Sequence, residues 1–265
     1  MTMGLMRAAW AYRGFILGSV RREFESRYRN SMLGAAWTIL NPLAMIAVYT
    51  LIFSQLMKAR LPGAEGEFAY SIYLCAGLFA WNLFAEIVTR SQTMFLDQAN
   101  LLKKLNFPRI CLPIIVVCSA LLNFGILLGL FSIFLLLSGN FPGWAVIAVL
   151  PLLLIQLAYA TGLGMILGVL NVFFRDVGQF FGILLQFWFW LTPIVYSSSI
   201  VPDSVRPALE LNPMTPLMAA WQNLFVRGEW PHWMTLMPTT SLAIVLCLMG
   251  LMLFRRRADE MVDEL

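Results

Sequence analysis

Long apolar stretches separated by short charged segments make up most of this chain. The longest, from Ile110 to Phe174, contains no Asp, Glu, Lys, Arg or His. A helix needs about 20 apolar residues to cross the hydrocarbon core of a bilayer, so this stretch is long enough for two crossings. Gly139, Asn140, Pro142 and Gly143 are typical turn residues and lie between its two halves. The pattern therefore predicts a polytopic, all-α membrane protein.

Six apolar stretches between charged residues are candidate membrane spans. In chain order they are Ser31 to Met57, Phe68 to Thr89, Cys111 to Leu137, Trp144 to Leu170, Gly178 to Ser197 and Leu236 to Phe254. We therefore divide the chain into a cytoplasmic interface helix, residues 1–30, and a six-span transmembrane domain, residues 31–265. A composition of 60% hydrophobic and 12% charged residues, with a mean hydropathy of +0.78, leaves little chain for a soluble domain.

Positive charges are distributed unequally between the two sides of these spans. With both termini inside, the inner segments contain Arg7, Arg13, Arg21, Arg22, Arg27, Arg29, Arg90, Lys103, Lys104, Arg109, Arg175, Arg255, Arg256 and Arg257. The outer segments contain Lys58, Arg60, Arg206 and Arg227. This bias predicts cytoplasmic termini, because positive residues concentrate on the cytoplasmic side of membrane proteins. We attribute the net charge of +4 to topology and to contact with anionic lipids, and expect no nucleic-acid partner.

An amphipathic helix is predicted ahead of the first span. Its apolar residues recur at helical spacing, and arginines lie beside them. The apolar stripe consists of Trp10, Leu17, Val20, Phe24 and Tyr28, and the arginines are Arg21, Arg22, Arg27 and Arg29. Such a helix lies in the membrane interface with its arginines toward lipid phosphates. The pattern fits a topology anchor and a docking surface for a partner equally well.

Two inner loops are candidates for contact with a motor protein. In the first, residues 91–110, Asn100 can cap a short amphipathic helix that Pro108 ends. The residues of this helix are Leu101, Leu102, Lys103 and Lys104. The alternative is a solvated loop whose lysines only set the topology. In the second loop, residues 171–177, we interpret Arg175 and Asp176 as interfacial anchors in preference to a second contact point.

The outer segment, residues 198–235, combines prolines with the apolar stretch Met214 to Val226, and neither half is long enough to span. We expect two short helices, broken near Asn212 and Pro213, that enter the outer leaflet as a re-entrant pair. This arrangement is allowed where protein shields the backbone. A plain extracellular cap is the alternative.

The fifth predicted span is the most aromatic part of the chain. It contains Phe180, Phe181, Phe187, Trp188, Phe189 and Trp190, with Tyr196 at its outer end. Interfacial aromatic belts lie at the ends of spans, whereas Trp188 and Trp190 lie inside this one. Aromatic faces stack on the C–H faces of sugars, so these residues are candidates for a glycan track. Helix packing and lipid contact are the competing interpretation, and residue chemistry alone favours them.

Glu86 is the main ionisable residue inside a predicted span. Arg90 follows at i+4, which favours a local ion pair over proton coupling. Two glycine pairs, Gly125 with Gly129 and Gly164 with Gly168, have the small-xxx-small spacing that permits close helix approach, within the chain or in a dimer.

Several kinds of chemistry are absent from the sequence. It contains no G-x-x-x-x-G-K-[S/T] motif for ATP phosphates and no series of buried carboxylates and histidines that could relay ions. Cys75, Cys111, Cys118 and Cys247 lie in apolar runs and form neither a disulfide framework nor a metal motif. No nucleophile or acid–base pair indicates an enzyme. Uphill transport would therefore depend on energy from another protein.

Several motifs, in the same order over nearly the whole chain, resemble those of ABC-2 type permeases of polysaccharide exporters. They are Arg21-Arg22-Glu-Phe through Arg27-Tyr28-Arg29-Asn-Ser31, Leu33-Gly34, Trp37 with Leu40-Asn-Pro42-Leu43, Asn100-Leu-Leu-Lys-Lys with Phe107-Pro108-Arg109, Phe174-Arg175-Asp176, Gln186-Phe-Trp-Phe-Trp-Leu-Thr-Pro193-Ile-Val-Tyr196 and Asn212-Pro-Met-Thr-Pro216-Leu. Within the family the chain resembles the lipopolysaccharide O-antigen export permeases, with capsule and teichoic acid exporters as near relatives.

The resemblance implies a homodimer of six-span subunits in the bacterial inner membrane. Two copies of a separate ATPase would bind ATP and Mg, so this chain itself needs no cofactor and is not an enzyme. Turnover would move a lipid-diphosphate-linked glycan from the cytoplasm to the periplasm. By analogy, the residues that meet the ATPase are the interface helix, Asn100 to Lys104, Phe107, Arg109, Arg175 and Asp176. Those that face the glycan are Trp37, Tyr49, Phe187, Trp188, Trp190 and Tyr196, and the re-entrant helices correspond to Ser199 to Arg227.

Two other functions remain open from the sequence. One is an ABC-2 exporter of small amphiphiles, which would share the same core. The other is a self-sufficient secondary transporter or channel, against which the missing ion relay counts. The identity and length of the sugar chain are not encoded in any motif.

Overall fold

The structure is a computed structural model that describes residues 10–27, 33–52, 66–104, 107–198, 201–204, 206–257 and 260–264. Over these residues it is all helical and contains no strand. The α-helices are α2 (Arg13–Arg27), α3 (Trp37–Tyr49), α4 (Ala69–Asp97), α5 (Ala99–Lys104), α6 (Cys111–Leu137), α7 (Val149–Phe173), α8 (Asp176–Trp190), α9 (Arg206–Leu211), α10 (Met214–Arg227), α11 (Trp233–Arg257) and α12 (Glu260–Glu264). Two 3₁₀ helices, η1 (Gly34–Ala36) and η3 (Gly143–Ala148), precede α3 and α7.

Among the described residues, four helices are long and apolar enough to cross a membrane. They are Ala69–Asp97, Cys111–Leu137, Gly143–Phe173 and Trp233–Arg257. These helices confirm the second, third, fourth and sixth predicted spans. In the first, the apolar helix covers Trp37–Ile52, and the predicted continuation to Met57 lies outside the described residues.

The fifth predicted span is helical over a shorter range than expected. Helix α8 has 15 residues and ends at Trp190, although the apolar pattern continues to Ser197. A residue before proline avoids the α conformation, so the Thr192-Pro193 step explains this early end. At about 1.5 Å per residue, α8 alone is too short for a complete crossing.

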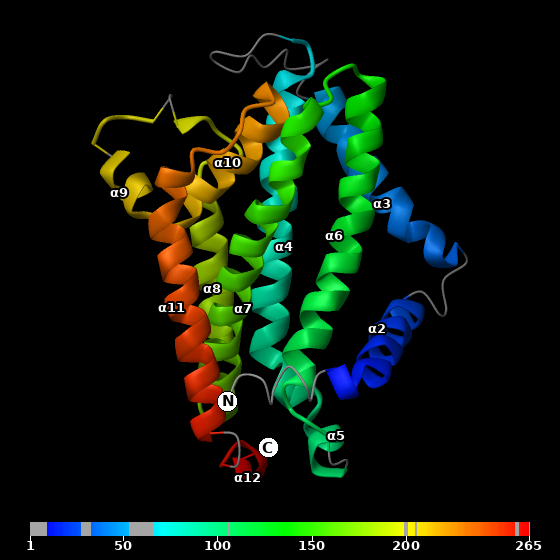
Figure 1. The fold of residues 1–265 in the computed structure, drawn as a ribbon, viewed down its shortest axis with the longest axis vertical. Helices are drawn as coiled ribbons and strands as arrows, with labels where there is room; N and C mark the ends of the chain where they lie inside the picture. The colour runs from blue at the N-terminus through cyan, green and yellow to red at the C-terminus, as the bar shows by residue number, and fades with distance from the viewer. Residues whose placement is uncertain are drawn as a thin grey trace.

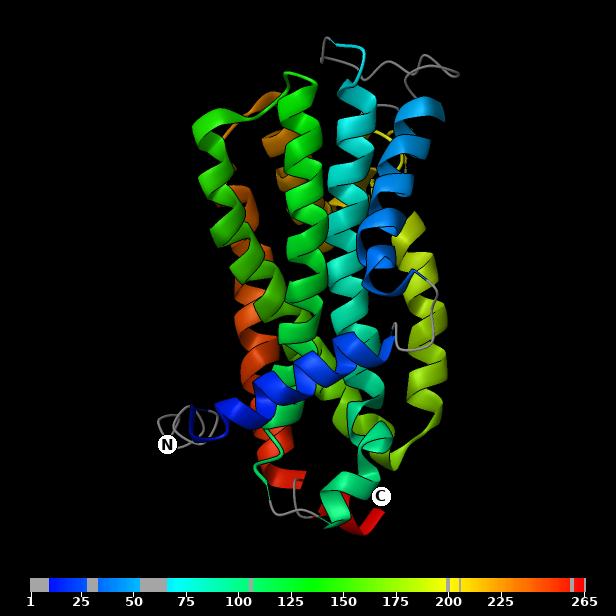
Figure 2. The same ribbon diagram turned by 90° about the vertical axis from the view of Figure 1, so that its right-hand side faces the viewer.

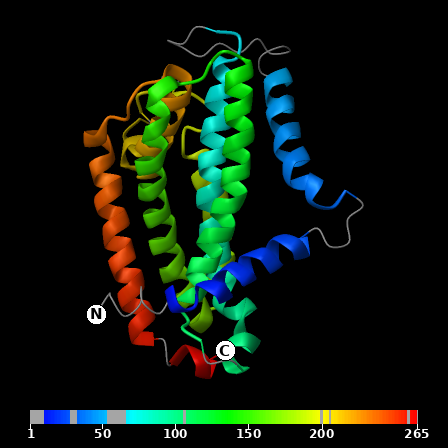
Figure 3. The same ribbon diagram turned by 45° about the vertical axis from the view of Figure 1, so that its right-hand side comes forward.

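Helix α4 lies at the centre of the bundle. Its most apolar 18-residue window is 78% buried, compared with 22% for α11. Helix α7 packs extensively against both α4 and α11. Figure 1 shows α2, α5 and α12 at one end of the bundle, called the α5 end below, and α9 and α10 toward the opposite end. Figure 3 shows α3 at the edge of the bundle, where it contacts α6 and α4.

The two predicted glycine pairs differ in their surroundings. A Cβ atom added at Gly168 would lie 2.4 Å from the backbone oxygen of Ser91, and one at Gly164 would lie 2.6 Å from the Ser91 Cβ. These glycines therefore bring α7 close to α4 within the subunit. A Cβ atom at Gly125 or Gly129 would meet nothing within 4 Å, so this pair makes no comparable contact in the described subunit.

The outer segment forms two short helices that break at Asn212 and Pro213, as predicted. One face of α10 packs into the core, including Met214, Leu217, Trp221 and Phe225. Gly228, at a φ of 65°, ends this helix in the left-handed conformation that glycine adopts most easily. The depth of α9 and α10 in the membrane stays a prediction.

The backbone that follows α8 is irregular, but its carbonyl groups accept hydrogen bonds from side chains. The Tyr70 hydroxyl donates to the Val195 carbonyl at 2.6 Å. The Tyr73 hydroxyl lies 3.1 Å from the Pro193 carbonyl and 3.0 Å from that of Tyr196. Gln222 Nε2 lies 3.3 and 3.2 Å from the carbonyls of Pro193 and Ile194. Side chains of α4 and α10 therefore replace the hydrogen bonds that a helix would have supplied.

Candidate functional site

Helix α2 crosses the α5 end of the bundle, oblique to the long helices (Figure 2). It packs mainly against α6, with Ile16 and Val20 buried. Two members of the predicted apolar stripe, Trp10 and Leu17, are exposed in the subunit, and their contact with lipid stays a prediction. Residues at spacings of four, Ile16 and Val20, form the packing face instead.

The structure describes only some of the other residues predicted for the interface helix. Phe24 is half-buried and lines a small pocket between α2 and α6. The side chain of Arg27, together with Tyr28 and Arg29, lies outside the described residues. Whether α2 lies in the membrane interface remains a prediction.

A polar cluster joins α2 to the membrane helices. Arg90 Nη1 lies 3.4 Å from Glu86 Oε1, which confirms the predicted ion pair. Arg90 Nη2 also lies 2.6 Å from Glu23 Oε1 of α2. Two side chains of α6 complete the cluster: Ser119 Oγ donates to Glu23 at 2.9 Å, and Asn123 Nδ2 donates to Glu86 at 2.8 Å. The sequence analysis missed Glu23, because no local spacing connects it to residues 67 and 96 positions away.

A groove of about 790 Å³ opens beside this cluster. Residues of α2, α4, α5 and α6 line it, including Arg22, Arg90, Asp97 and Leu101. Its lining is mixed: charged side chains lie next to apolar ones such as Leu112. The groove therefore brings the interface helix and the first inner loop to one place on the α5 end.

The predicted first inner loop begins inside α4, which continues to Asp97, and its short helix forms as predicted, but Asn100 does not cap this helix. Helix α5 begins at Ala99, so Asn100 lies inside its first turn. The N–H groups of Leu101 and Leu102 donate to the Gln98 carbonyl, because the chain turns directly from the end of α4. Lys103 is exposed, and the side chain of Lys104 lies outside the described residues.

Phe107 attaches this loop to the rest of the α5 end. Its ring centroid lies 5.1 Å from that of Phe15 on α2. Phe107 and Leu102 also pack against a second apolar cluster that includes Phe95 and Met261. Arg109, in the turn before α6, is half-buried. The loop is therefore connected both to α2 and to the ends of the long helices.

The second inner loop is held by the buried amide of Asn171. Asn171 Nδ2 donates to the Gln92 carbonyl of α4 at 2.9 Å, and its Oδ1 accepts from the Gly178 N–H of α8 at the same distance. Arg175 and Asp176 are exposed at the start of α8. Both predicted inner contact regions therefore present side chains at the α5 end, although Asn171 was not predicted to support them.

The tryptophans of α8 point to different sides of the helix. Trp188 faces the core, where its ring packs against Trp81, Phe84 and Tyr159, and its Nε1 donates to Asn212 Oδ1 at 2.8 Å. Trp190 is 64% exposed. The geometry therefore favours packing for Trp188 and leaves Trp190 available for contact outside the subunit.

The exposed side of α8 carries an apolar stripe. Phe180, Ile183, Phe187 and Trp190 are all more than half exposed and recur at helical spacing. We call these four residues the α8 stripe. The stripe contains two of the predicted glycan-facing residues, Phe187 and Trp190, on one side of one helix.

The other predicted glycan-facing residues lie on α3 and in the segment after α8. Trp37 is exposed in the first turn of α3, whereas Tyr49, near the end of that helix, is half-buried. The two are separated by about 18 Å along the helix axis. The Tyr196 hydroxyl donates to the Trp190 carbonyl at 2.8 Å and so helps to end α8. A single subunit therefore does not gather the six residues on one surface.

Asn212 is a half-buried connection that was predicted only as a helix break. Its Oδ1 accepts from Trp188 Nε1 and from the Met214 N–H, and its Nδ2 donates to the Leu191 carbonyl and Thr192 Oγ1. Four hydrogen bonds satisfy the whole amide. This side chain fixes the outer end of α8 against the start of α10.

The described residues contain no cluster of the usual metal ligands. Across these ranges, no three His, Cys, Asp or Glu side chains are grouped in a way that could hold a metal ion. Cys75, Cys111, Cys118 and Cys247 are free thiols. The arrangement is instead that of a membrane bundle with two contact regions, one at the α5 end and one along α8.

Comparison with known proteins gives consistent matches. A family model described as ABC-2 type transporter matches residues 16–226. The O-antigen export system permease protein RfbA of Myxococcus xanthus is 33% identical over 98% of this chain and 99% of its own length. A protein of the same name from Klebsiella pneumoniae is 30% identical over 89% and 88% of the two chains. The polysialic acid transport protein KpsM of Escherichia coli is 22% identical over 92% and 93%.

Proposed function

The chain belongs to the ABC-2 type transporter family, and we propose that it is the permease subunit of an ATP-driven polysaccharide exporter. Its substrate is a lipid-diphosphate-linked glycan of the O-antigen class, which it moves from the cytoplasm to the periplasm across the bacterial inner membrane. The observation that carries this proposal is the similarity to an O-antigen export permease over 98% of the chain. Capsular polysaccharide is the second candidate substrate, supported by the similarity to a polysialic acid transport protein.

The proposed assembly contains two copies of this chain and two copies of a separate ATPase, which binds ATP and Mg. In each subunit, α3 and α8 contribute the first and fifth of six crossings. Helices α9 and α10 enter the outer leaflet, and both termini are cytoplasmic. Basic residues at the α5 end support this orientation, among them Arg22, Lys103, Arg175 and Arg255.

Each contact region has a role in this proposal. The ATPase binds at the α5 end, where α2, α5, Phe107, Arg109 and the loop before α8 present side chains. The α8 stripe and Trp37 face the glycan path between the two subunits. Aromatic residues suit a moving glycan, since they offer broad contact area without strong hydrogen bonds that would hold one sugar in place.

The test is transport in liposomes that contain the purified permease with or without its ATPase. We expect lipid-linked glycan to reach the lumen only when ATPase, ATP and Mg are present together. Gradient-driven flux by the permease alone would indicate a secondary transporter. ATP-dependent movement of small amphiphiles, but not of glycans, would indicate the other ABC-2 function.

Replacing each tryptophan of α8 by alanine separates glycan contact from packing. Trp190→Ala is expected to lower export about threefold to tenfold, because an aromatic contact contributes roughly 1 kcal/mol, while the amount of protein in the membrane stays near wild type. Trp188→Ala is expected to lower export and the amount of protein in the membrane together, since it removes a core side chain that contributes about 3 kcal/mol to stability. Export is measured in the liposome assay and protein amount by immunoblot. An equal fall in both quantities for Trp190→Ala would indicate that this residue also serves packing.

A further inference from the structure

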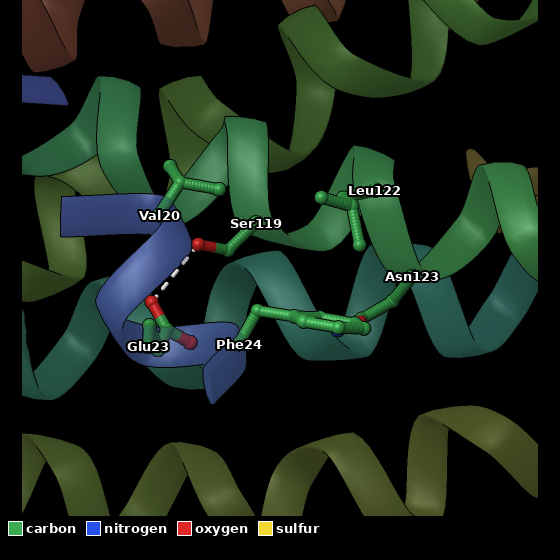
Figure 4. Close-up of a pocket in the computed structure, with 6 residues that line it drawn as sticks. All are labelled: Val20, Glu23, Phe24, Ser119, Leu122 and Asn123. Carbon is green, nitrogen blue, oxygen red and sulfur yellow. Dashed lines mark hydrogen bonds between the residues drawn. The ribbon is translucent and has the colours of Figure 1, made fainter. Parts of the chain in front are cut away.

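Helix α2 is held on the bundle by a small set of contacts. Its buried apolar residues are Ile16 and Val20, and Phe15 adds the ring contact with Phe107. The remaining strong attachment is Glu23, whose two carboxylate oxygens bind different helices: Arg90 of α4 at 2.6 Å and Ser119 of α6 at 2.9 Å. Figure 4 shows Glu23 and Ser119 facing each other beside Val20. One side chain therefore links α2 to two membrane helices.

Arg90 pairs with two carboxylates of this cluster, Glu23 and Glu86. The side chains of these three residues are between 26% and 31% exposed. Such partly shielded charges interact more strongly than charges at the open surface, where screening leaves little net stabilisation. Without Arg90, both carboxylates would lose this ion pair.

The cluster also forms part of the wall of the α5-end groove. Glu23 and Arg90 line the groove together with Arg22 and Leu101. The spacing between α2 and α4, and hence the shape of the groove, therefore depends on the Glu23–Arg90 pair.

We propose that Arg90 is a positioning residue that ties α2 to α4 and α6 through Glu23, so that a displacement of α2 is transmitted to the membrane helices. The transmission rests on the proposed function, in which the ATPase acts at the α5 end. The link is separate from the α5 helix and from Phe107, because it runs directly from the interface helix to the centre of the bundle.

The variants Glu23→Gln, Arg90→Gln and the double variant E23Q/R90Q test this link. Asp203→Asn is the control, since Asp203 also pairs with an arginine, Arg206, but lies at the exposed surface beside α9, away from the α5 end. Spin labels at Leu17 and Ile133, both exposed, report the distance between α2 and α6 in the assembled complex, with native cysteines replaced. Glycan export per ATP hydrolysed is measured on the same preparations.

Arg90→Gln is expected to broaden the distance distribution and to lower export per ATP about tenfold, equivalent to roughly 1.4 kcal/mol. The double variant should be milder than Arg90→Gln, because it removes one of the two carboxylates left facing each other. Arg90→Lys should restore much of the coupling, and Asp203→Asn should change neither quantity.

Two results would overturn the proposal: an unchanged distance distribution in Arg90→Gln, or a broadened distribution with unchanged export per ATP. If the loss of export per ATP in the double variant equals the sum of the losses in the two single variants, the two residues do not act as a pair. If the wild-type complex exports no glycan, the proposed function fails, whereas the distance measurement still decides whether Arg90 holds α2.

Discussion

Replacing Gly168 by valine is expected to remove most of the folded protein from the membrane. A Cβ atom at this position would lie 2.4 Å from the backbone oxygen of Ser91. Backbone cannot move aside as a flexible side chain can, so α7 and α4 must separate. Because α4 is the central helix, we expect a loss of about 3 kcal/mol, or more than 100-fold in the folding equilibrium. Monodisperse protein in detergent and its Tm provide the measurement.

Gly129→Val is the matched control for this substitution. It places the same side chain in the middle of α6, where an added Cβ atom meets nothing within 4 Å. We expect its yield and Tm to stay near wild type. Equal losses in the two variants would contradict the assignment of Gly168 to packing between α7 and α4.

Replacing Phe107 by alanine is expected to uncouple ATP hydrolysis from export. The ring contacts Phe15 of α2 and packs against the apolar cluster at the ends of the long helices. Its loss releases the first inner loop from both, while the spanning helices keep their contacts. We expect ATP hydrolysis to continue and export per ATP to fall at least about tenfold, from a loss of roughly 2 kcal/mol at a half-buried site. Both rates are measured on the same liposomes.

A scrambled sequence over Asn100 to Lys104 should also lower export per ATP while ATP hydrolysis continues. Phe141→Ala is the control for Phe107→Ala, because Phe141 is an exposed phenylalanine in the turn between α6 and α7, at the opposite end of the bundle. Co-purification of the ATPase separates uncoupling from loss of the complex. Retained export with a fully scrambled loop would exclude this helix as the coupling element.

The long spans were predictable because their signal is local. Helix α6 runs from Cys111, near the start of the uncharged stretch, to Leu137, just before the turn residues Gly139 and Asn140, and no distant contact is needed to define it. Helix α8 was not predictable in the same way, because apolar residues continue past Trp190 while Thr192-Pro193 ends the helix. A proline signal inside an apolar stretch should therefore outweigh hydropathy when the end of a span is placed.

The site was predictable by residue type more than by orientation. Trp188 and Trp190 are about 200° apart around a helix, so periodicity alone could have assigned them to opposite sides. Helical periodicity could likewise have separated the buried Ile16 from the neighbouring, exposed Leu17 on α2. The Glu23–Arg90 pair and the three bonds from Asn212 to Trp188, Leu191 and Thr192 join segments that are distant in sequence, and only the folded chain brings them together.

The irregular backbone after α8 limits how the bundle can rearrange. The carbonyls of Pro193, Ile194, Val195 and Tyr196 take their donors from Tyr70, Tyr73 and Gln222. If α8 slid along α4, these oxygens would lose their donors. Each carbonyl left without a hydrogen bond in a medium without water costs several kcal/mol. The outer ends of α4, α8 and α10 must then move together as one rigid unit. Any hinge that opens a passage has to lie outside this unit.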